Sequence, residues 1–484
     1  MTPASPPQIS HENRLVITAL VTATFVVILN ETIMNVALPR LMAELRIDAT
    51  TVQWLATAFM LTMSVVIPTT GFLLQRLARR TVFILAMGLF SAGTLLAALA
   101  PGFGILLLAR VVQASGTAIM LPLLMTSVLT LVPVARRGQV MGTVSIVISV
   151  APAIGPTISG LILQFLSWRF MFLTVLPIAL AALVYGARKL GGSAEAERPR
   201  LDAFSVVLTV PAFGGLVYGL SQLGGTGSGL GPALPLAVGV AALGLFVWRQ
   251  LVLQRSGSPL LDLRAFTHPM YTVATALLVV GMVALFGVVI LLPIYLQQVQ
   301  GLDTLATGLL LLPGGLVMGL LSPTVGKWFD RVGPVPLTLT GTTLMTAVLF
   351  ALAFLNAATP VWLVLVMHML MSLGLALLFT PAFTSGLNPL PPHLYSHGSA
   401  ILSTLQQVAG AAGTALLVGV MAAQAHASAT GAATSAIEAQ LSGFRAAFLV
   451  AAIVAIAAIV LAAFLRNRPA LPATEEGAPA AAVH

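Results

Sequence analysis

The stretch LVITALVTATFVVILNETIMNVAL, residues 15–38, carries an acidic residue inside an apolar run. At about 1.5 Å per residue, a helix of this length crosses a hydrocarbon layer of roughly 30 Å. Glu31 alone among the 13 acidic residues lies well within an apolar span. Because an ionised carboxylate is costly there and a proton neutralises it, we predict that Glu31 is a protonation site. A permanently protonated Glu, or one salt-bridged to hold two helices together, is the structural alternative.

The composition of the whole chain is that of a polytopic membrane protein. Of the 484 residues, 58% are hydrophobic and 7% are charged, and the mean hydropathy is +1.03. These values lie far outside the balance of soluble globular chains. The chain has no cysteine, which excludes disulfides and thiol metal sites. The polar segment 1–14 shows no cleavage site before a short apolar core, so we expect the first span to remain as a signal anchor.

Fourteen apolar spans can be placed along the chain, which predicts an all-α fold of two pseudo-symmetric six-helix bundles with two extra helices between them. The first bundle, 15–187, contains the spans 15–38, 51–74, 81–100, 103–128, 139–163 and 168–187. A linker, 188–202, precedes the inserted spans 203–223 and 233–252, and a second linker, 253–269, follows them. The second bundle, 270–465, contains 270–296, 305–326, 335–355, 360–383, 398–424 and 444–465. We expect the Pro/Ala-rich tail, 466–484, to be disordered.

The basic residues indicate the orientation of these spans. Seventeen of them fall on the side of the N-terminus and four on the opposite side, so both termini are predicted to be cytoplasmic. The larger set includes Arg76, Arg79, Arg80, Arg136, Arg137, Lys327 and Arg331, and the smaller set is Arg40, Arg46, Arg169 and Arg445. The net charge of +9 is therefore explained by topology, without a nucleic-acid partner.

Arg110 belongs to neither set, because it lies about seven residues into the fourth span. Glu31 lies about seven residues before the outer end of the first span, so both charges are expected roughly 10 Å below the same boundary. Equal depth makes them possible partners, and protonation of Glu31 would loosen the pair. Gln113 follows Arg110 at i+3, and Asn35 follows Glu31 at i+4, so each of the two spans carries a polar stripe along one face. Alternatively, Arg110 bonds backbone carbonyls and only fixes helix packing.

Two loops of the chain resemble each other. Gly71 is followed by Gln75, Arg76, Ala78 and Arg79, and Gly326 is followed at the same spacing by Asp330, Arg331 and Gly333. Each loop joins the second and third spans of a bundle, which favours two homologous bundles. In the fifth span, Ala151, Gly155 and Ser159 form a small-residue face, while Pro152 and Pro156 are expected to bend the helix. Topogenic charge alone also explains Arg79 and Arg80.

Together these motifs resemble the major facilitator superfamily, in particular its fourteen-span drug:proton antiporters of the lincomycin-resistance type. The resemblance covers about residues 12–465, and its motifs are LNETIMNVALP (29–39), GFLLQRLARR (71–80), LLLARVVQASGTA (106–118), APAIGPTISG (151–160), SWRFMF (167–172), LLPIYLQQVQG (291–301) and LNPLPPHLYSHGSAILSTLQQVAGAAGTAL (387–416). It implies a rocker-switch exporter with Glu31 as the protonatable site, Arg110 as its coupling partner, and Gly155 with Pro156 as the antiporter signature.

The sequence departs from the family pattern at three positions. Asn30 stands where the branch commonly has Asp, so the acid is one residue later and is turned by about 100° around the helix. Gln75 replaces an Asp and Ala78 replaces a Gly, which puts the charge latch of the first half in doubt. Asp330, Arg331 and Gly333 keep the pattern in the second half.

A drug exporter needs a large apolar chamber with a few polar anchors. Our substrate-binding candidates at mid-membrane depth are Asn35, Gln53, Trp54, Thr57, Met60, Gln113, Tyr295, Gln298, His368 and Gln407. For any single Met or aromatic residue, core packing is the commoner role. His368 could titrate near neutral pH or be a hydrogen-bonded packing residue. His393 and His397 fall in a predicted loop, where solvation is expected rather than metal binding.

The function predicted from these residues is proton-coupled export of amphipathic drugs across a bacterial cell membrane by a monomer, with the proton gradient in place of a cofactor. The two lysines, Lys189 and Lys327, fit no phosphate-binding loop, and the few intramembrane polar groups argue against an enzyme or a channel. A proton symporter for a nutrient and a non-transporting sensor on the same fold are the alternatives.

Overall fold

The computed structural model describes residues 9–191, 202–223, 231–256, 259–429 and 436–465, and every regular element in these ranges is a helix. Fourteen helical spans within these ranges are long and apolar enough to cross a membrane, which confirms the predicted number. The predicted disordered tail and most of the first linker lie outside the described residues.

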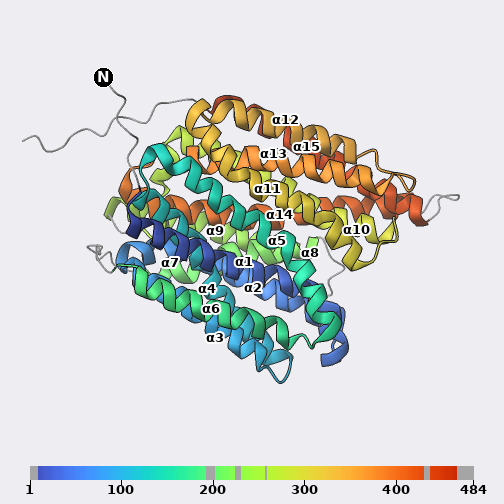
Figure 1. The fold of residues 1–484 in the computed structure, drawn as a ribbon, viewed down its shortest axis with the longest axis horizontal. Helices are drawn as coiled ribbons and strands as arrows, with labels where there is room; N and C mark the ends of the chain where they lie inside the picture. Colours follow the sequence, from blue (N-terminus) through green and yellow to red (C-terminus); the bar gives the residue numbers. More distant parts are fainter. Residues whose placement is uncertain (1–8, 192–201, 224–230, 257–258, 430–435, 466–484) are drawn as a thin grey trace, which may run out of the picture.

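The first bundle consists of six long helices (Figure 1). They are α1 (His11–Leu45), α2 (Ala49–Arg76), α3 (Arg79–Ala98), α4 (Phe103–Leu131), α5 (Arg137–Phe165, after the short η1, Val134–Arg136) and α6 (Arg169–Lys189). Helix α1 extends beyond the predicted apolar span at both ends. The side chain of Ser10 accepts the backbone N–H of Asn13 at the start, and Arg40 pairs with Glu44 at i,i+4 near the end. These contacts stabilise helical turns outside the hydrocarbon layer.

The inserted helices are α7 (Ala203–Thr209), the π-helical segment η2 (Val210–Gly214), α8 (Gly215–Leu223) and α9 (Ala233–Ser256). The first three form a single span. Pro211 lies within η2 and has no backbone N–H, so the regular i→i−4 pattern is interrupted there.

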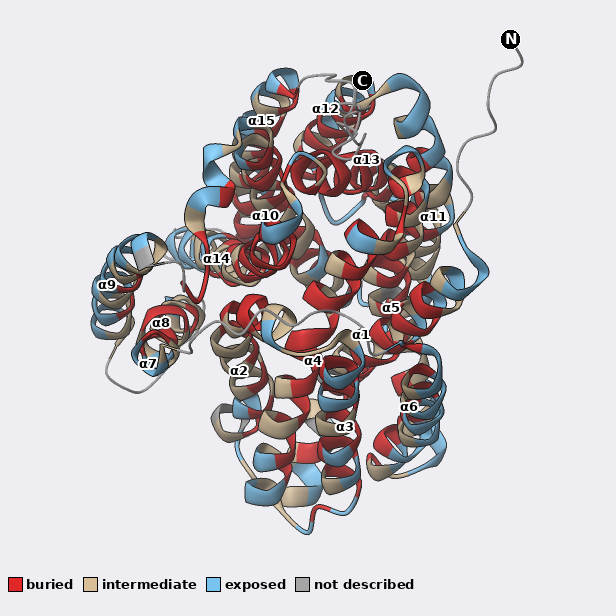
Figure 2. Ribbon diagram, turned by 90° about the vertical axis from the view of Figure 1, so that its left-hand side faces the viewer, coloured by how far each residue is buried: buried red, intermediate tan, exposed pale blue. Residues whose placement is uncertain are grey.

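The second bundle repeats the arrangement of the first. It consists of α10 (Pro269–Gln298), α11 (Thr304–Val332), α12 (Pro334–Leu352), α13 (Val361–Leu387), α14 (Tyr395–Ala429) and α15 (Ala436–Phe464), with η3 (Leu263–Thr267) and η4 (Pro392–Leu394) in its connections. Figure 2 shows α10–α15 above α1–α6, with the inserted helices at one side, next to α2 and α14.

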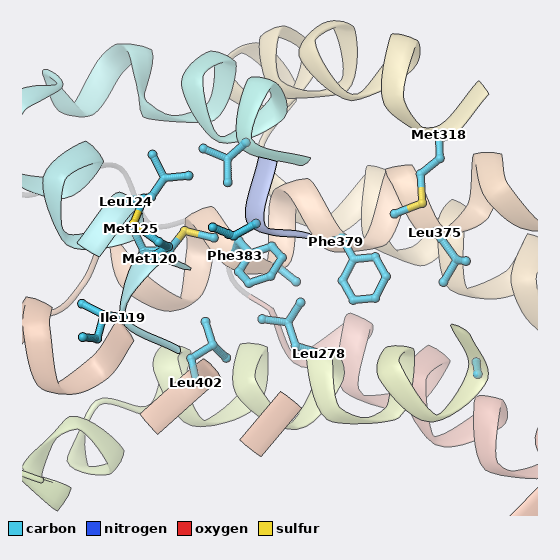
Figure 3. Packing of buried hydrophobic residues seen from close by; sticks show 14 of the residues in the cluster. Ile119, Met120, Leu124, Met125, Leu278, Met318, Leu375, Phe379, Phe383 and Leu402 are labelled. Atoms are coloured by element: carbon cyan, nitrogen blue, oxygen red, sulfur yellow. The ribbon is translucent and has the colours of Figure 1, made fainter. Parts of the chain in front are cut away.

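The two bundles meet along α5 with α11 and along α2 with α14. Figure 3 shows that the buried apolar side chains form one continuous cluster across this seam, from Ile119 and Met120 of α4 to Leu402 of α14 and Phe383 of α13. One end of the molecule, where α1 begins and α15 ends, also carries most of the basic residues, and we call it the basic end. The other is the opposite end.

Candidate functional site

Glu31 lies in the middle third of α1, on a side of the helix that is only partly covered. Its neighbours Asn30, Ile33 and Met34 are each at most 3% exposed, so they pack into the first bundle while Glu31 keeps some accessible surface. Thr32 faces α5, where a Cβ added to Gly155 would collide with its side chain. The absence of a side chain at Gly155 therefore lets α5 approach α1 directly beside Glu31.

Arg110 lies on α4 and is 1% exposed. Its Nη1 donates to Oε1 of Gln113 at 2.5 Å, and its Nε approaches the carbonyl oxygen of Leu55 on α2 at 3.5 Å. The guanidinium carbon lies 4.0 Å from the ring centroid of Phe59, a cation–π geometry that is strong when desolvated. Arg110 thus joins α4 to α2. The approach to the carbonyl oxygen of Leu55 is the kind of backbone contact that the packing alternative predicts, and the contacts with Gln113 and Phe59 add to it.

Gln113 connects this arginine to a third helix. It is fully buried, and its Nε2 donates to Oγ1 of Thr94 on α3 at 2.8 Å. The Thr94 hydroxyl in turn donates to the carbonyl oxygen of Phe90 at 2.7 Å. Gly93 allows this approach, because a Cβ there would meet the backbone of Gln113. A chain of buried hydrogen bonds therefore fixes the orientation of the guanidinium.

Glu31 and Arg110 lie close enough to interact electrostatically. They form no ion pair within 4.0 Å; the ion pairs described for this chain are Arg40–Glu44, Arg249–Asp202 and Arg264–Asp262. The carboxylate is therefore influenced by a fixed positive charge without being locked to it. This arrangement can bind and release a proton with little rearrangement of Arg110.

Several of the substrate candidates line the seam between α2 and α14. Nε2 of Gln407 lies 3.4 Å from Sδ of Met63, a residue that we did not single out from the sequence. Met60 lies about one turn and Thr57 about two turns before Met63 on α2, and both are partly exposed. Thioether, hydroxyl and amide side chains therefore occur within about two turns of the contact between Gln407 and Met63.

Two further candidates lie nearer the opposite end, where Trp54 stacks on Tyr218 of the inserted α8 with ring centroids 5.7 Å apart. Gln53 beside it is exposed. The backbone of Asn35 lies in α1, but its side chain is outside the described residues.

The remaining candidates lie within the second bundle, away from Glu31 and Arg110. Tyr295 is fully buried, and its hydroxyl donates to the carbonyl oxygen of Asn356 at 2.8 Å. Gln298 is exposed at the end of α10. His368 is packed against Gly314, and its Nε2 lies 3.1 Å from the carbonyl oxygen of Leu311. Local hydrogen bonds therefore account for the Tyr295 hydroxyl and for Nε2 of His368, whereas Nδ1 of His368 is buried without a hydrogen-bond partner.

The repeated glycines lie at contacts between the bundles at the basic end. A Cβ added to Gly326 would collide with the backbone of Gly138 on α5, and Oδ2 of Asp330 accepts the backbone N–H of Gln139 at 3.2 Å. In the first loop, Gly71 faces His397 on α14.

The other motif residues of these two loops differ in their exposure and contacts. Arg76 and Arg331 are exposed. Gln75, which replaces the family's acid, donates to the carbonyl oxygen of His393 at 3.2 Å. Gly333 adopts a positive φ of 79°, which glycine tolerates without strain. The ring of Pro156 is outside the described residues.

Arg137, which the sequence suggested only as a topogenic charge, is 6% exposed in the seam. It donates to the carbonyl oxygen of Leu129 at 2.6 Å, to Oδ1 of Asn388 at 3.1 Å and to the hydroxyl of Tyr395 at 3.4 Å. Nothing in the charge pattern distinguishes it from the half-buried Arg136 or from exposed basic residues such as Arg76 and Arg331.

The expectation of a solvated His397 was wrong. It is 3% exposed, because α14 begins at Tyr395 and its first turn packs His397 against Gly71 of α2. No group of three or more potential metal ligands occurs in the described parts of the chain.

Comparison with known proteins agrees with this architecture. The profile of the Major Facilitator Superfamily matches residues 20–414. The chain belongs to this superfamily. It is 40% identical to the lincomycin resistance protein LmrB of Listeria monocytogenes over 457 residues, which cover 93% of this chain and 96% of the relative. It is 30% identical to a multidrug resistance protein B homolog of Mycobacterium tuberculosis over 430 residues, which cover 86% and 79% of the two chains.

Among solved structures, the proton:xylose symporter XylE superposes with a TM-score of 0.67 at 13% identity, covering 95% of this chain and 97% of that one. This likeness establishes the fold alone. As a major facilitator, the protein is a membrane transporter of small molecules and not an enzyme.

Proposed function

We propose that this transporter is a proton-coupled antiporter that exports amphipathic drugs, with Glu31 as its protonation site and Arg110 as the coupling partner. The observation that carries the proposal is Glu31, a partly buried residue held in mid-span within electrostatic reach of a buried, immobilised arginine. The relatives named for lincomycin and multidrug resistance favour drugs as the cargo.

The orientation of the molecule follows from its charges. The basic end is cytoplasmic in our proposal, since basic residues collect on that side of bacterial membrane proteins. Hydrogen bonds from Arg137, Gln139, Gln75 and Thr380 join the bundles in the half nearest this end. We therefore assign the present conformation to a state that is closed on the cytoplasmic side.

The coupling follows from electrostatics. An ionised Glu31 is attracted to Arg110 across the interior of the first bundle, and a proton on Glu31 removes that attraction. We infer that the two charge states favour different facings of the transporter. Drug bound at the seam, near Met60, Met63 and Gln407, would favour the facing in which the proton is released.

The direction of transport separates this proposal from its alternatives. Inverted membrane vesicles with an acidic interior should accumulate a lincosamide in exchange for protons if the protein is an antiporter. A nutrient symporter would not concentrate the drug under this gradient, and a sensor would move it in neither direction. Drug accumulation that does not depend on the gradient would contradict the proposed coupling.

Replacing Arg110 with Ala should reduce gradient-driven drug uptake at least roughly tenfold. It should also move the pH of half-maximal drug binding by about one unit or more, because a charge next to a buried acid changes its protonation by this amount. Drug binding to purified protein at a series of pH values measures the shift. Arg169→Ala is a matched control, since Arg169 donates to the carbonyl oxygen of Ala100 away from Glu31. An unaltered pH profile in Arg110→Ala would contradict its role.

A further inference from the structure

A buried glutamine ties the two inserted spans together and to the linker that follows them. Gln250 of α9 is fully buried. Its Nε2 donates to Oγ of Ser205 on α7 at 2.9 Å. Its Oε1 accepts the backbone N–H groups of Leu260 at 2.8 Å and Leu261 at 3.2 Å. Both leucines are buried, so these N–H groups depend on a protein partner.

An ion pair fixes the same corner from the other side. Arg249 binds both carboxylate oxygens of Asp202, at 2.9 and 3.1 Å, and Asp202 also accepts from the backbone and hydroxyl of Ser205. The hydrogen bond from Arg249 and those from Ser205 outweigh burial and hold the pKa of Asp202 at about 2. The carboxylate therefore stays ionised, and this contribution to stability is lost only as the pH falls toward 2.

The linker reaches the second bundle through the same backbone segment. The η3 turn that follows this segment lies against α14. Phe266 of η3 packs on Tyr271 with ring centroids 5.5 Å apart, and the Tyr271 hydroxyl donates to the carbonyl oxygen of Gly398, the residue after His397, at 2.9 Å. Asp262 of the linker binds Arg264 at 2.6 Å and Gln254 at 3.1 Å, which fixes the direction of the linker. Burial alone would raise the pKa of Asp262, but the hydrogen bonds from Arg264 outweigh it and lower the pKa.

His397 also faces the first bundle. An ideal Cβ at Gly71 of α2 would lie 3.1 Å from its Nδ1 and 3.5 Å from Cβ of Ala400. A continuous set of contacts therefore leads from α7 and α9, through the linker and Tyr271, to the seam that is closed at the basic end.

We propose that the inserted helices brace the closed basic end, and that Gln250 is the positioning residue that fixes the linker and so holds the first turn of α14, with His397, against Gly71. The inference rests on the alternating access of our proposed function. When Gln250 cannot accept from the linker, residues 260–262 lose their fixed path and the first turn of α14 loses the support of the linker. The closed state is then destabilised, while drug-binding residues and Glu31 are untouched.

The absence of cysteine from the natural chain makes a direct test possible. Ala400→Cys places one thiol at a fully buried position of the seam, where a water-soluble maleimide reacts only when the basic end opens. In the full-length protein, Gln250→Leu should raise the maleimide labelling rate roughly tenfold, as expected for the loss of buried hydrogen bonds. Gln222→Leu is the matched control, because Gln222 is on the same inserted unit but binds only Tyr218 in the described structure.

The results distinguish the brace from the proposed function. Faster labelling with Gln250→Leu, unchanged labelling with Gln222→Leu, and a non-additive effect of combining Gln250→Leu with His397→Phe support the brace. If Gln250→Leu fails to fold, Ser205→Ala removes one bond of the same set and should show a smaller increase. Labelling that responds to pH but is unaffected by either variant overturns the brace alone. A thiol that never reacts in any variant overturns alternating access and the brace with it.

Discussion

Replacing Glu31 with Gln should reduce gradient-driven drug export to the background rate while the protein still inserts and folds. The amide keeps the size and hydrogen-bonding capacity of a protonated carboxyl group, but it cannot release a proton. The two charge states that we infer to drive alternation then become one. Initial rates of lincosamide uptake into inverted vesicles, with and without an imposed pH gradient, measure the loss. Exchange of labelled for unlabelled drug, which needs no net proton movement, should persist.

Glu44→Gln is the matched control for this experiment. It makes the same chemical change on the same helix, but Glu44 is exposed near the end of α1 and pairs with Arg40. Because such a surface pair contributes little, export should remain near the unmodified rate. Full gradient-driven export by Glu31→Gln would exclude Glu31 as the coupling site.

The second large effect is expected at Gly326, where α11 meets α5. Gly326→Leu should abolish transport, because even the first atom of a side chain would collide with the backbone of Gly138. A backbone cannot rotate away as a flexible side chain can, so the bundles must separate at the basic end. Disulfide formation between cysteines introduced at Gln75 and His393, which lie in contact across the seam, reports this separation and should fall at least roughly tenfold.

Gly88→Leu controls for the insertion of a bulky residue into a membrane helix. Gly88 lies in α3 with no atom within 4 Å of an added Cβ, so the new side chain enters open space. This variant should transport normally and form the disulfide normally. Normal disulfide formation in Gly326→Leu would mean that the contact with Gly138 is not needed for closure.

The fold could be predicted because the membrane imposes it. Runs of about 20 apolar residues must form helices that satisfy their own backbone hydrogen bonds, and this gave the fourteen spans and their order. Glu31 and Arg110 could be singled out for the same reason, since a charge in such a run is exceptional. Their functional roles stay predictions, to be tested by the substitutions above.

The contacts between helices could not be predicted in the same way. Which face of α14 meets α2 depends on tertiary packing, so His397 was placed in solvent although it is buried in the first turn of a helix. Arg137 looked like the other basic residues on its side of the membrane, because a positive charge near a helix end has the same pattern whether it faces water or a second bundle. Gln250 gave no signal, because two of its three partners are the backbone N–H groups of Leu260 and Leu261, and the third, Ser205, is 45 residues away in the chain.

The most direct test of the central claim is proton release from purified protein when drug binds. In weakly buffered solutions at a series of pH values, adding a lincosamide to the unmodified protein should release protons in proportion to the drug bound. Glu31→Gln should bind the drug and release none. Equal proton release from Glu31→Gln and from the unmodified protein would contradict the account, because the exchanged proton would then reside elsewhere.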